Sequence, residues 1–207
     1  MKVQFNLIKS PNQNIKINFK IFESIQNKKK FKSFSYNKKS IFDYQISIRN
    51  SQIDVSLCYS IKSPDLFHKT VMGSFIHDYS VKFEASQIEI VCEDQSLLDN
   101  IITGFKQKDF IYSIYKQNSS KEKFKTSYKL EKNNTEKLKS INFLKELVSE
   151  PSNIIYPESF VKRTEKQINK SKVKIKILDQ KKIKQIGLNC LLAVSQGSAR
   201  QPRVMEF

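Results

Sequence analysis

Apolar and polar side chains alternate along much of the first 93 residues, with the two-residue period that predicts β-strands. Strands are expected at residues 4–9, 15–22, 42–49, 53–61, 81–84 and 88–91. In the two clearest of them, one face carries Ile15, Ile17, Phe19 and Ile21, and Ile53, Val55, Leu57 and Tyr59. A turn is expected at Ser63-Pro64. The pattern therefore predicts that this part of the chain forms a sheet.

Helical spacing replaces the alternation after residue 93. Asp94 is expected to cap a helix. The apolar face of that helix would carry Leu97, Leu98, Ile101, Ile102 and Phe105. The aromatic residues Phe110, Tyr112 and Tyr115 would continue this face or form a second helix, as part of the core. The polar, Lys-rich residues 117–135 are the best candidate for a linker.

The last third of the chain combines helical and strand patterns. A helix is expected with Leu138, Ile141, Leu144 and Val148 on one face. Pro157 suits the first position of a second helix. That helix would bury Phe160, Val161, Thr164 and Ile168. Residues 173–177 read as a strand exposed on one face, and Asp179 would cap a short helix that Gly187 ends.

Strands and helices in this order predict the α/β class. We expect an N-terminal mixed sheet flanked by helices, followed by the truncated start of a second α/β domain. The predicted domains are an N-terminal α/β domain at 1–133, a linker helix at 134–150, and the start of a catalytic domain at 151–207.

Several ordered segments near the end of the chain carry a more specific signal. Leu144–Asn153 reads LKELVSEPSN, Pro157–Phe160 reads PESF, and Leu188–Phe207 reads LNCLLAVSQGSARQPRVMEF. Together with the strand at 173–179 and the helix at 183–187, these segments resemble the leucyl aminopeptidase family (M17), which consists of dinuclear-metal exopeptidases. The residues that carry the motifs, with an expected structural role, are Pro151, Asn153, Pro157, Gly187, Gln196, Gly197, Ser198, Pro202 and Arg203.

The resemblance, with a fainter one over residues 97–116, implies the N-terminal portion of a metallopeptidase that releases N-terminal residues from peptides. In the family's order, the ligands of two divalent metals (Mn or Zn) follow the strand that matches Val204–Phe207. We therefore expect neither metal ligands nor catalytic residues in this chain, and no hydrolysis by it alone. The family also implies a homo-oligomer, a hexamer. The remainder of the catalytic domain or another subunit would cover the C-terminal strand.

The chain departs from the family pattern at several positions. Lys145 replaces the usual Arg, Ser149 the usual Asn, and Tyr156 the usual Thr. Tyr cannot cap a helix locally as Thr does, which should cost about 1 kcal/mol. These departures leave open a second function, in which a non-catalytic structural relative docks on a partner.

The formal net charge of +17 raises a third hypothesis, a nucleic-acid-binding module. Lys28–Lys30 and Lys38–Lys39 lie near Phe31, Phe34 and Tyr36, so stacking on single strands is conceivable. A solvated loop explains these clusters equally well. Only four of the 37 basic residues are Arg, the residue that phosphate and base recognition favours. The charge predicts only salt-dependent, non-specific binding to polyanions.

The remaining candidate groups suggest structural roles. Cys58, Cys92 and Cys190 lack metal-ligand or disulfide spacing and are expected to be reduced and mostly packed. His68 and His77 are expected at unrelated strand or loop positions, as surface or packed residues rather than ligands. Asp94 and Asp99 are interpreted as acids at a helix start.

The N-terminus has neither the apolar region of a secretory signal nor the character of a transit peptide. The sequence also contains no apolar run near 18 residues, which excludes a transmembrane helix within it. A cytoplasmic location is the expectation.

Overall fold

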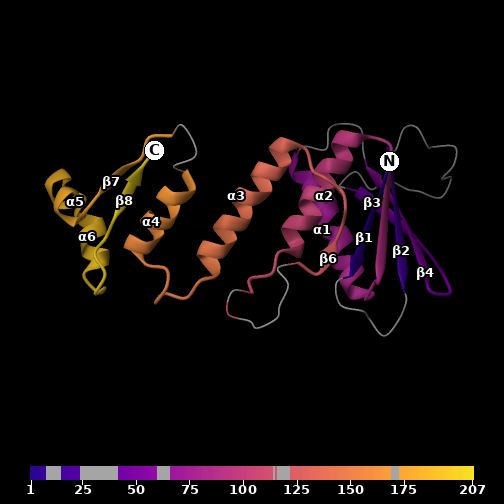
Figure 1. Cartoon of the computed structure of the whole chain (residues 1–207), viewed down its shortest axis with the longest axis horizontal. Helices are drawn as coiled ribbons and strands as arrows, with labels where there is room; N and C mark the ends of the chain where they lie inside the picture. The colour runs from indigo at the N-terminus through magenta and orange to yellow at the C-terminus, as the bar shows by residue number, and fades with distance from the viewer. Residues whose placement is uncertain (8–14, 24–41, 60–65, 114, 116–121, 169–172) are drawn as a thin grey trace. The chain divides into compact units, whose positions relative to one another are not determined.

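The computed structural model describes the whole chain except residues 8–14, 24–41, 60–65, 114, 116–121 and 169–172 (Figure 1). The described residues form two compact units, Met1–Phe143 and Leu144–Phe207. The first contains a six-stranded mixed sheet and the second a two-stranded sheet, each with helices. The predicted α/β class, with an N-terminal mixed sheet flanked by helices, is confirmed. The boundaries at 1–133, 134–150 and 151–207 stay a prediction.

The sheet of the first unit has the strand order β3-β4-β2-β5-β1-β6. Its strands are β1 (Lys2–Leu7), β2 (Lys16–Glu23), β3 (Phe42–Arg49), β4 (Gln52–Tyr59), β5 (Gln87–Cys92) and β6 (Phe124–Lys125). β2 runs parallel to both β4 and β5, and the other pairs are antiparallel. Five of the six strands expected from the alternation are present.

One face of this sheet forms the core, as the alternation predicts. The buried side chains of the central strands are Ile17, Phe19, Ile21, Ile53, Val55, Leu57, Ile88 and Ile90. Helices α1 (Leu66–Lys82) and α2 (Gln95–Asp109) contribute to the same core cluster and lie on one side of the sheet (Figure 1). Polar residues occupy the alternate positions, such as Asn18 and Asp54, whose side chains hydrogen-bond to each other at 2.8 Å.

Helix α1 was not expected, and the predicted strand at 81–84 is wrong. Val81 lies in the last turn of α1, and Glu84 follows with a left-handed backbone, φ 50°. The alternation of Val81 and Phe83 with polar neighbours covers too few residues to distinguish a strand from a helix end. Both His68 and His77 lie on this helix, not on unrelated strand or loop positions.

The two helices approach each other closely at a pair of glycines. A Cβ atom at Gly73 would lie 2.0 Å from the carbonyl oxygen of Ile101, and one at Gly104 would lie 2.2 Å from that of Thr70. Both distances are far below van der Waals contact, so only glycine permits this crossing. The crossing brings α2 onto α1 along the core face of the sheet.

Helix α2 begins as predicted. It ends before Phe110, so it does not continue through Phe110, Tyr112 and Tyr115, which was one of the two expectations. The Asp94 side chain accepts a hydrogen bond from Leu97 N at 3.1 Å, which confirms it as the N-cap. The helix ends at Asp109, and Phe110 has an extended backbone with φ −61° and ψ 126°. The described residues 110–113 are not helical, so the expectation of a helix through Tyr112 is wrong there.

The carboxylate of Asp109 binds the chain where it returns to the sheet. It accepts hydrogen bonds from the backbone N–H groups of Lys123, at 3.1 Å from both oxygens, and Phe124, at 3.0 Å. The Nε2 atom of His77 lies 3.1 Å from the same carboxylate. These contacts position β6 beside β1, with Phe124 buried in the core.

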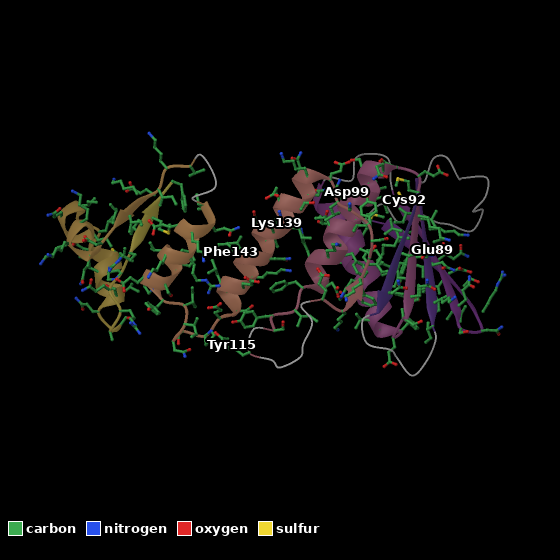
Figure 2. The ribbon with its side chains drawn as sticks, in the orientation of Figure 1. Glu89, Cys92, Asp99, Tyr115, Lys139 and Phe143 are labelled. Carbon is green, nitrogen blue, oxygen red and sulfur yellow. The ribbon has the colours of Figure 1, made fainter. Side chains whose placement is uncertain are left out.

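Asp99, labelled in Figure 2, has a similar role and is not an acid of a helix start. Its buried carboxylate accepts hydrogen bonds from Tyr128 Oη at 3.2 Å, Glu131 N at 3.0 Å and the side-chain amide of Asn134. Burial, followed by the charge of Asp99, raises the pKa of Tyr128 to about 12, so its hydroxyl remains a donor. The described part of the predicted linker at 117–135 is therefore bound to the first unit.

The elements of the second half follow the predictions closely. They are α3 (Lys132–Ser149), α4 (Pro157–Ile168), β7 (Lys176–Leu178), α5 (Gln180–Ile186), α6 (Asn189–Ser195) and β8 (Val204–Glu206). Pro157 is the first residue of α4, as expected.

The predicted burial in this half is only partly correct. Val161 and Thr164 are buried, but Leu144, Val148 and Phe160 are exposed. Strand β7 begins three residues after Val173, and its described buried residue is Leu178. The helical period identified the helices, but it did not determine which of their apolar residues are buried against other elements.

Candidate functional site

The residues that carry the family motifs all lie in the second unit, beginning with the turn between α3 and α4. Glu150 is buried, and one of its carboxylate oxygens forms an ion pair with Arg163 of α4. The carbonyl of Pro151 accepts hydrogen bonds from Ile154 N at 2.9 Å and Ile155 N at 3.0 Å. Pro151 and Asn153 are exposed in this turn. The ion pair therefore fixes the turn to the helix that follows it.

At the start of α4, Tyr156 stands where the family pattern has a threonine, and a different side chain binds the backbone there. Ser159 accepts a hydrogen bond from the backbone N–H of Tyr156 at 2.9 Å and donates to the carbonyls of Ile154 or Tyr156. A side chain at the third helical position that binds the capping residue's N–H is one half of a capping box. The ring of Tyr156 itself lies 4.1 Å from the guanidinium carbon of Arg200, in a cation–π contact.

Two local signals position the next helices. Asp179 accepts a hydrogen bond from Lys182 N at 2.8 Å and caps α5, as predicted. Gly187 has φ 81° and ends α5 with its N–H directed to the carbonyls of Ile183 and Lys184. A left-handed residue at this position favours glycine, which explains the residue found in the motif.

The Gln196-Gly197-Ser198 turn follows α6. The N–H of Gln196 donates to Ala193 O at 3.3 Å, and the N–H of Ser198 donates to Ser195 O at 3.0 Å. The hydroxyl of Ser198 then accepts a hydrogen bond from Arg200 N at 3.0 Å. Both the backbone and the serine side chain of the motif thus serve to turn the chain toward β8.

The Pro-Arg pair of the motif joins this turn to α4. Pro202 is buried, and its carbonyl accepts a hydrogen bond from Arg203 Nη1 at 2.9 Å. The Nη2 atom of Arg203 lies 3.0 Å from Glu158 Oε1, in the first turn of α4. This ion pair and the contact between Arg200 and Tyr156 join the segment before β8 to the start of α4.

A cavity of about 630 Å³ lies within this unit, and some of the motif residues line it. Its lining includes Asp179, Lys181, Lys184, Gln196, Ser198 and Pro202. The motif residues Gln196, Ser198 and Pro202 are therefore brought together, whereas Pro151, Asn153 and Gly187 are not part of this lining. The predictions from sequence did not include Tyr156, Glu158 or Arg163 among the site residues, although Tyr156 stood out as a departure from the family pattern.

The resemblance implies that the metal ligands follow the segment that matches Val204–Phe207, and so do not belong to the described residues. The described residues contain no group of three or more His, Cys, Asp or Glu side chains that could hold a metal ion. His77 is buried, and its ring nitrogens face Asp78 and Asp109. The side chain of His68 lies outside the described residues.

Cys92 is buried and reduced, and burial raises its pKa to about 11. Cys190 is also reduced but exposed, and the side chain of Cys58 lies outside the described residues. A thiol with so high a pKa is a poor nucleophile near neutral pH, so Cys92 is a packed residue. No helix in the described part of the chain is long and apolar enough to cross a membrane.

The model of the cytosol aminopeptidase family's catalytic domain matches residues 142–207. A probable cytosol aminopeptidase of Phytoplasma mali is 36% identical over 118 residues, which are 50% of this chain and 24% of that protein. Both matches support the cytosol aminopeptidase family (M17) for this part of the chain. A probable cytosol aminopeptidase of Methylorubrum extorquens is 48% identical over 59 residues, 28% of this chain and 12% of that protein. The chain thus spans a quarter or less of these relatives.

A similarity in fold to a solved structure extends over both units. A solved structure of a tomato leucine aminopeptidase mutant aligns with a TM-score of 0.53 and 13% identity. The alignment covers 97% of this chain and 52% of that one. At this identity the likeness establishes the α/β fold alone. It includes the N-terminal unit, most of which the family model does not match.

The ion pair at the motif turn gives a testable prediction. Replacing Arg163 with alanine is expected to lower the free energy of unfolding of the second unit by about 2–3 kcal/mol, because it leaves the buried carboxylate of Glu150 without its counter-ion. Lys139→Ala removes an exposed ion pair with Glu136 and is expected to leave the stability almost unchanged, because solvent screens such a pair. Hydrogen exchange of amides in Leu144–Phe207 measures the effect of Arg163→Ala, and exchange of the α3 amides measures that of Lys139→Ala. Equal effects of the two substitutions would contradict the prediction.

Proposed function

We propose that this chain is the N-terminal portion of a leucyl aminopeptidase-like metallopeptidase, which releases N-terminal residues from peptides. The observation that supports this is the family match over residues 142–207. The motif residues matched there form one connected unit, in which Arg203 reaches Glu158 and Arg200 reaches Tyr156. In this proposal, residues 1–133 are a non-catalytic α/β domain and residues 151–207 begin the catalytic domain.

The proposal assigns the motif residues a structural role. Pro157 and Gly187 begin and end helices, Ser198 turns the chain after α6, and Arg203 binds α4. None of them is proposed as a metal ligand or a catalytic group. In the resembled family, the ligands of the two divalent metals, Mn or Zn, follow the segment that matches Val204–Phe207. The chain alone is therefore proposed to lack peptidase activity.

The surface of the second unit supports a partner in the same catalytic domain. The exposed large apolar side chains of its C-terminal part include Ile177, Ile186, Leu188, Val194 and Phe207. Val194 is 83% exposed, although it belongs to the apolar stretch of α6. Covering such side chains stabilises a fold by about 1.5–3 kcal/mol each. We propose that the remainder of a catalytic domain covers this surface, with another subunit as the alternative and a hexamer as the assembly.

A chimeric enzyme tests the function. Residues 1–207 would be joined to the part of the Phytoplasma mali aminopeptidase that follows its matched region. With Mn²⁺ present, the chimera is expected to release the N-terminal leucine from a short peptide. The 207-residue chain alone, at the same metal concentration, is expected to release none.

Two results would contradict this proposal. The first is leucine release by the 207-residue chain alone, because the catalytic groups would then lie within it. The second is a chimera that shows the circular dichroism and thermal transition of a folded protein but has no activity. The relative's own full-length enzyme serves as the positive control for the assay.

A further inference from the structure

The edge of the six-stranded sheet at β3 has features of an interaction surface. Among the residues that the structure describes, β3 pairs only with β4, so one side of the strand has no partner strand. The register with β4 runs without interruption from Phe42 to Arg49. An uninterrupted edge strand presents a row of backbone N–H and C=O groups that can pair with another chain.

Apolar side chains accompany this free edge. Tyr44, Ile46 and Ile48 are 50%, 38% and 62% exposed. Their Cα partners on β4 are Leu57, Val55 and Ile53, all of which are buried in the core. Directly opposite residues of an antiparallel pair point to the same face, so the three exposed side chains extend the core face beyond its covered part.

Helix α1 covers only the beginning of this stripe. The ring of Tyr44 lies 5.0 Å from that of Phe75 on α1, measured between centroids. Ile46 and Ile48, further along the stripe, are exposed. Between Tyr44 and Ile48, where the strand reads YQISI, it contains neither proline nor a charged residue, which are the residues that usually protect an edge.

The order of residues in β3 is complementary to itself. In an antiparallel pair of two β3 strands centred on Ile46, Tyr44 of one copy lies opposite Ile48 of the other, and Ile46 lies opposite Ile46. Aromatic with β-branched pairs are favourable cross-strand pairs. The central pair of isoleucines would bury apolar surface. The same register places the acidic position 43 opposite the basic position 49, which have opposite formal charges.

We propose that β3 pairs antiparallel with β3 of a second copy of this chain, around a two-fold axis at Ile46. The two sheets then become one continuous sheet, and the exposed stripe of each copy is covered by the stripe of the other. A two-fold interface uses the same surface patch twice, which the order of residues about Ile46 satisfies. A foreign strand could use the backbone edge but would not need this symmetric order.

The contact is one strand wide, so it belongs with small and reversible interfaces. The dimer should therefore be observed as a concentration-dependent equilibrium. The inference rests on the N-terminal unit alone and stands whether or not the chain belongs to an active aminopeptidase.

Sedimentation velocity over a concentration series is the first test. The 207-residue chain is expected to shift from the monomer mass toward twice that mass. Ile46→Lys, which places two like charges opposite each other and removes the central apolar pair, is expected to weaken the dimer at least about tenfold. Gln45→Lys adds the same charge opposite Ser47 and is expected to change the dissociation constant by less than about threefold. A chain that stays monomeric throughout, or equal effects of both variants, would overturn the proposal.

Disulfide cross-linking gives a second test that does not depend on destabilising the strand. In a Cys190→Ser background, Ile46→Cys is expected to form a disulfide-linked dimer under mild oxidation, because the two Cβ atoms are opposite each other. Ile48→Cys is more exposed but would face Tyr44, so it should cross-link much more slowly. Equal rates for the two variants would mean random collision and would overturn the β3 register, as would the absence of cross-linking at position 46.

Discussion

Replacing Gly104 with alanine is expected to lower the free energy of unfolding of the N-terminal unit by about 3 kcal/mol. The new Cβ atom would lie 2.2 Å from Thr70 O and within 3 Å of two further backbone atoms of Thr70. Backbone cannot rotate away as a side chain can, so α1 and α2 must separate. The separation opens the core in which both helices are buried. Alanine's better helix propensity, worth about 1 kcal/mol, does not offset this loss.

Gly197→Ala is the matched control for this substitution. A Cβ atom at Gly197 would have nothing within 4 Å, and its backbone is not in the left-handed region. The control is therefore expected to change the stability by less than about 0.5 kcal/mol. Thermal unfolding, followed by circular dichroism and by hydrogen exchange of α1 and α2 amides, compares the two variants. A Gly104→Ala protein as stable as the control would show that the helices do not cross at this distance.

Replacing Asp109 with alanine is expected to destabilise the same unit by about 3 kcal/mol or more. The carboxylate binds the backbone N–H groups of Lys123 and Phe124 and faces His77 Nε2. Removing it leaves a buried N–H at Phe124 without its acceptor and deprives His77 of its buried partner. We expect β6 to detach from β1, so that Phe124 becomes accessible to water.

Asp78→Ala is the matched control, because Asp78 contacts the other ring nitrogen of His77, at 3.4 Å, but is largely exposed. Its loss is expected to cost less than about 1 kcal/mol. Hydrogen exchange at the amides of Lys123 and Phe124 distinguishes the two substitutions, since only Asp109→Ala should increase it strongly. If these amides exchanged at the same rate in both variants, the conclusion that Asp109 holds β6 in place would be wrong.

The two buried carboxylates of α2 act on the same stretch of chain. Asp109 binds residues 123–124, and Asp99 binds Tyr128, Glu131 and Asn134. Most of these contacts satisfy each carboxylate with neutral donors instead of a counter-ion. A polar stretch is thereby held against the N-terminal unit up to the start of α3.

The sequence by itself determined the elements whose signals are local. Alternation over eight residues identified β2, β3 and β4, because a strand buried on one face must repeat every two residues. Asp94, Asp179, Pro157 and Gly187 marked helix ends correctly, because each acts on backbone groups within a few positions. The motif residues of the second unit also act locally, because they begin helices, end helices or turn the chain between neighbouring elements.

Only the tertiary structure decided the features that depend on residues distant in the chain. The close crossing at Gly73 and Gly104, the roles of Asp99 and Asp109, and the packing of residues 122–131 all need a partner that the local pattern does not specify. The contacts between Glu158 and Arg203, 45 positions apart, are of the same kind. Helix α1 was missed because its apolar residues do not form one clean stripe, and its burial comes from the sheet and α2 together. Local periodicity fixes how a segment folds, whereas the partner that covers it is chosen by packing across the whole unit.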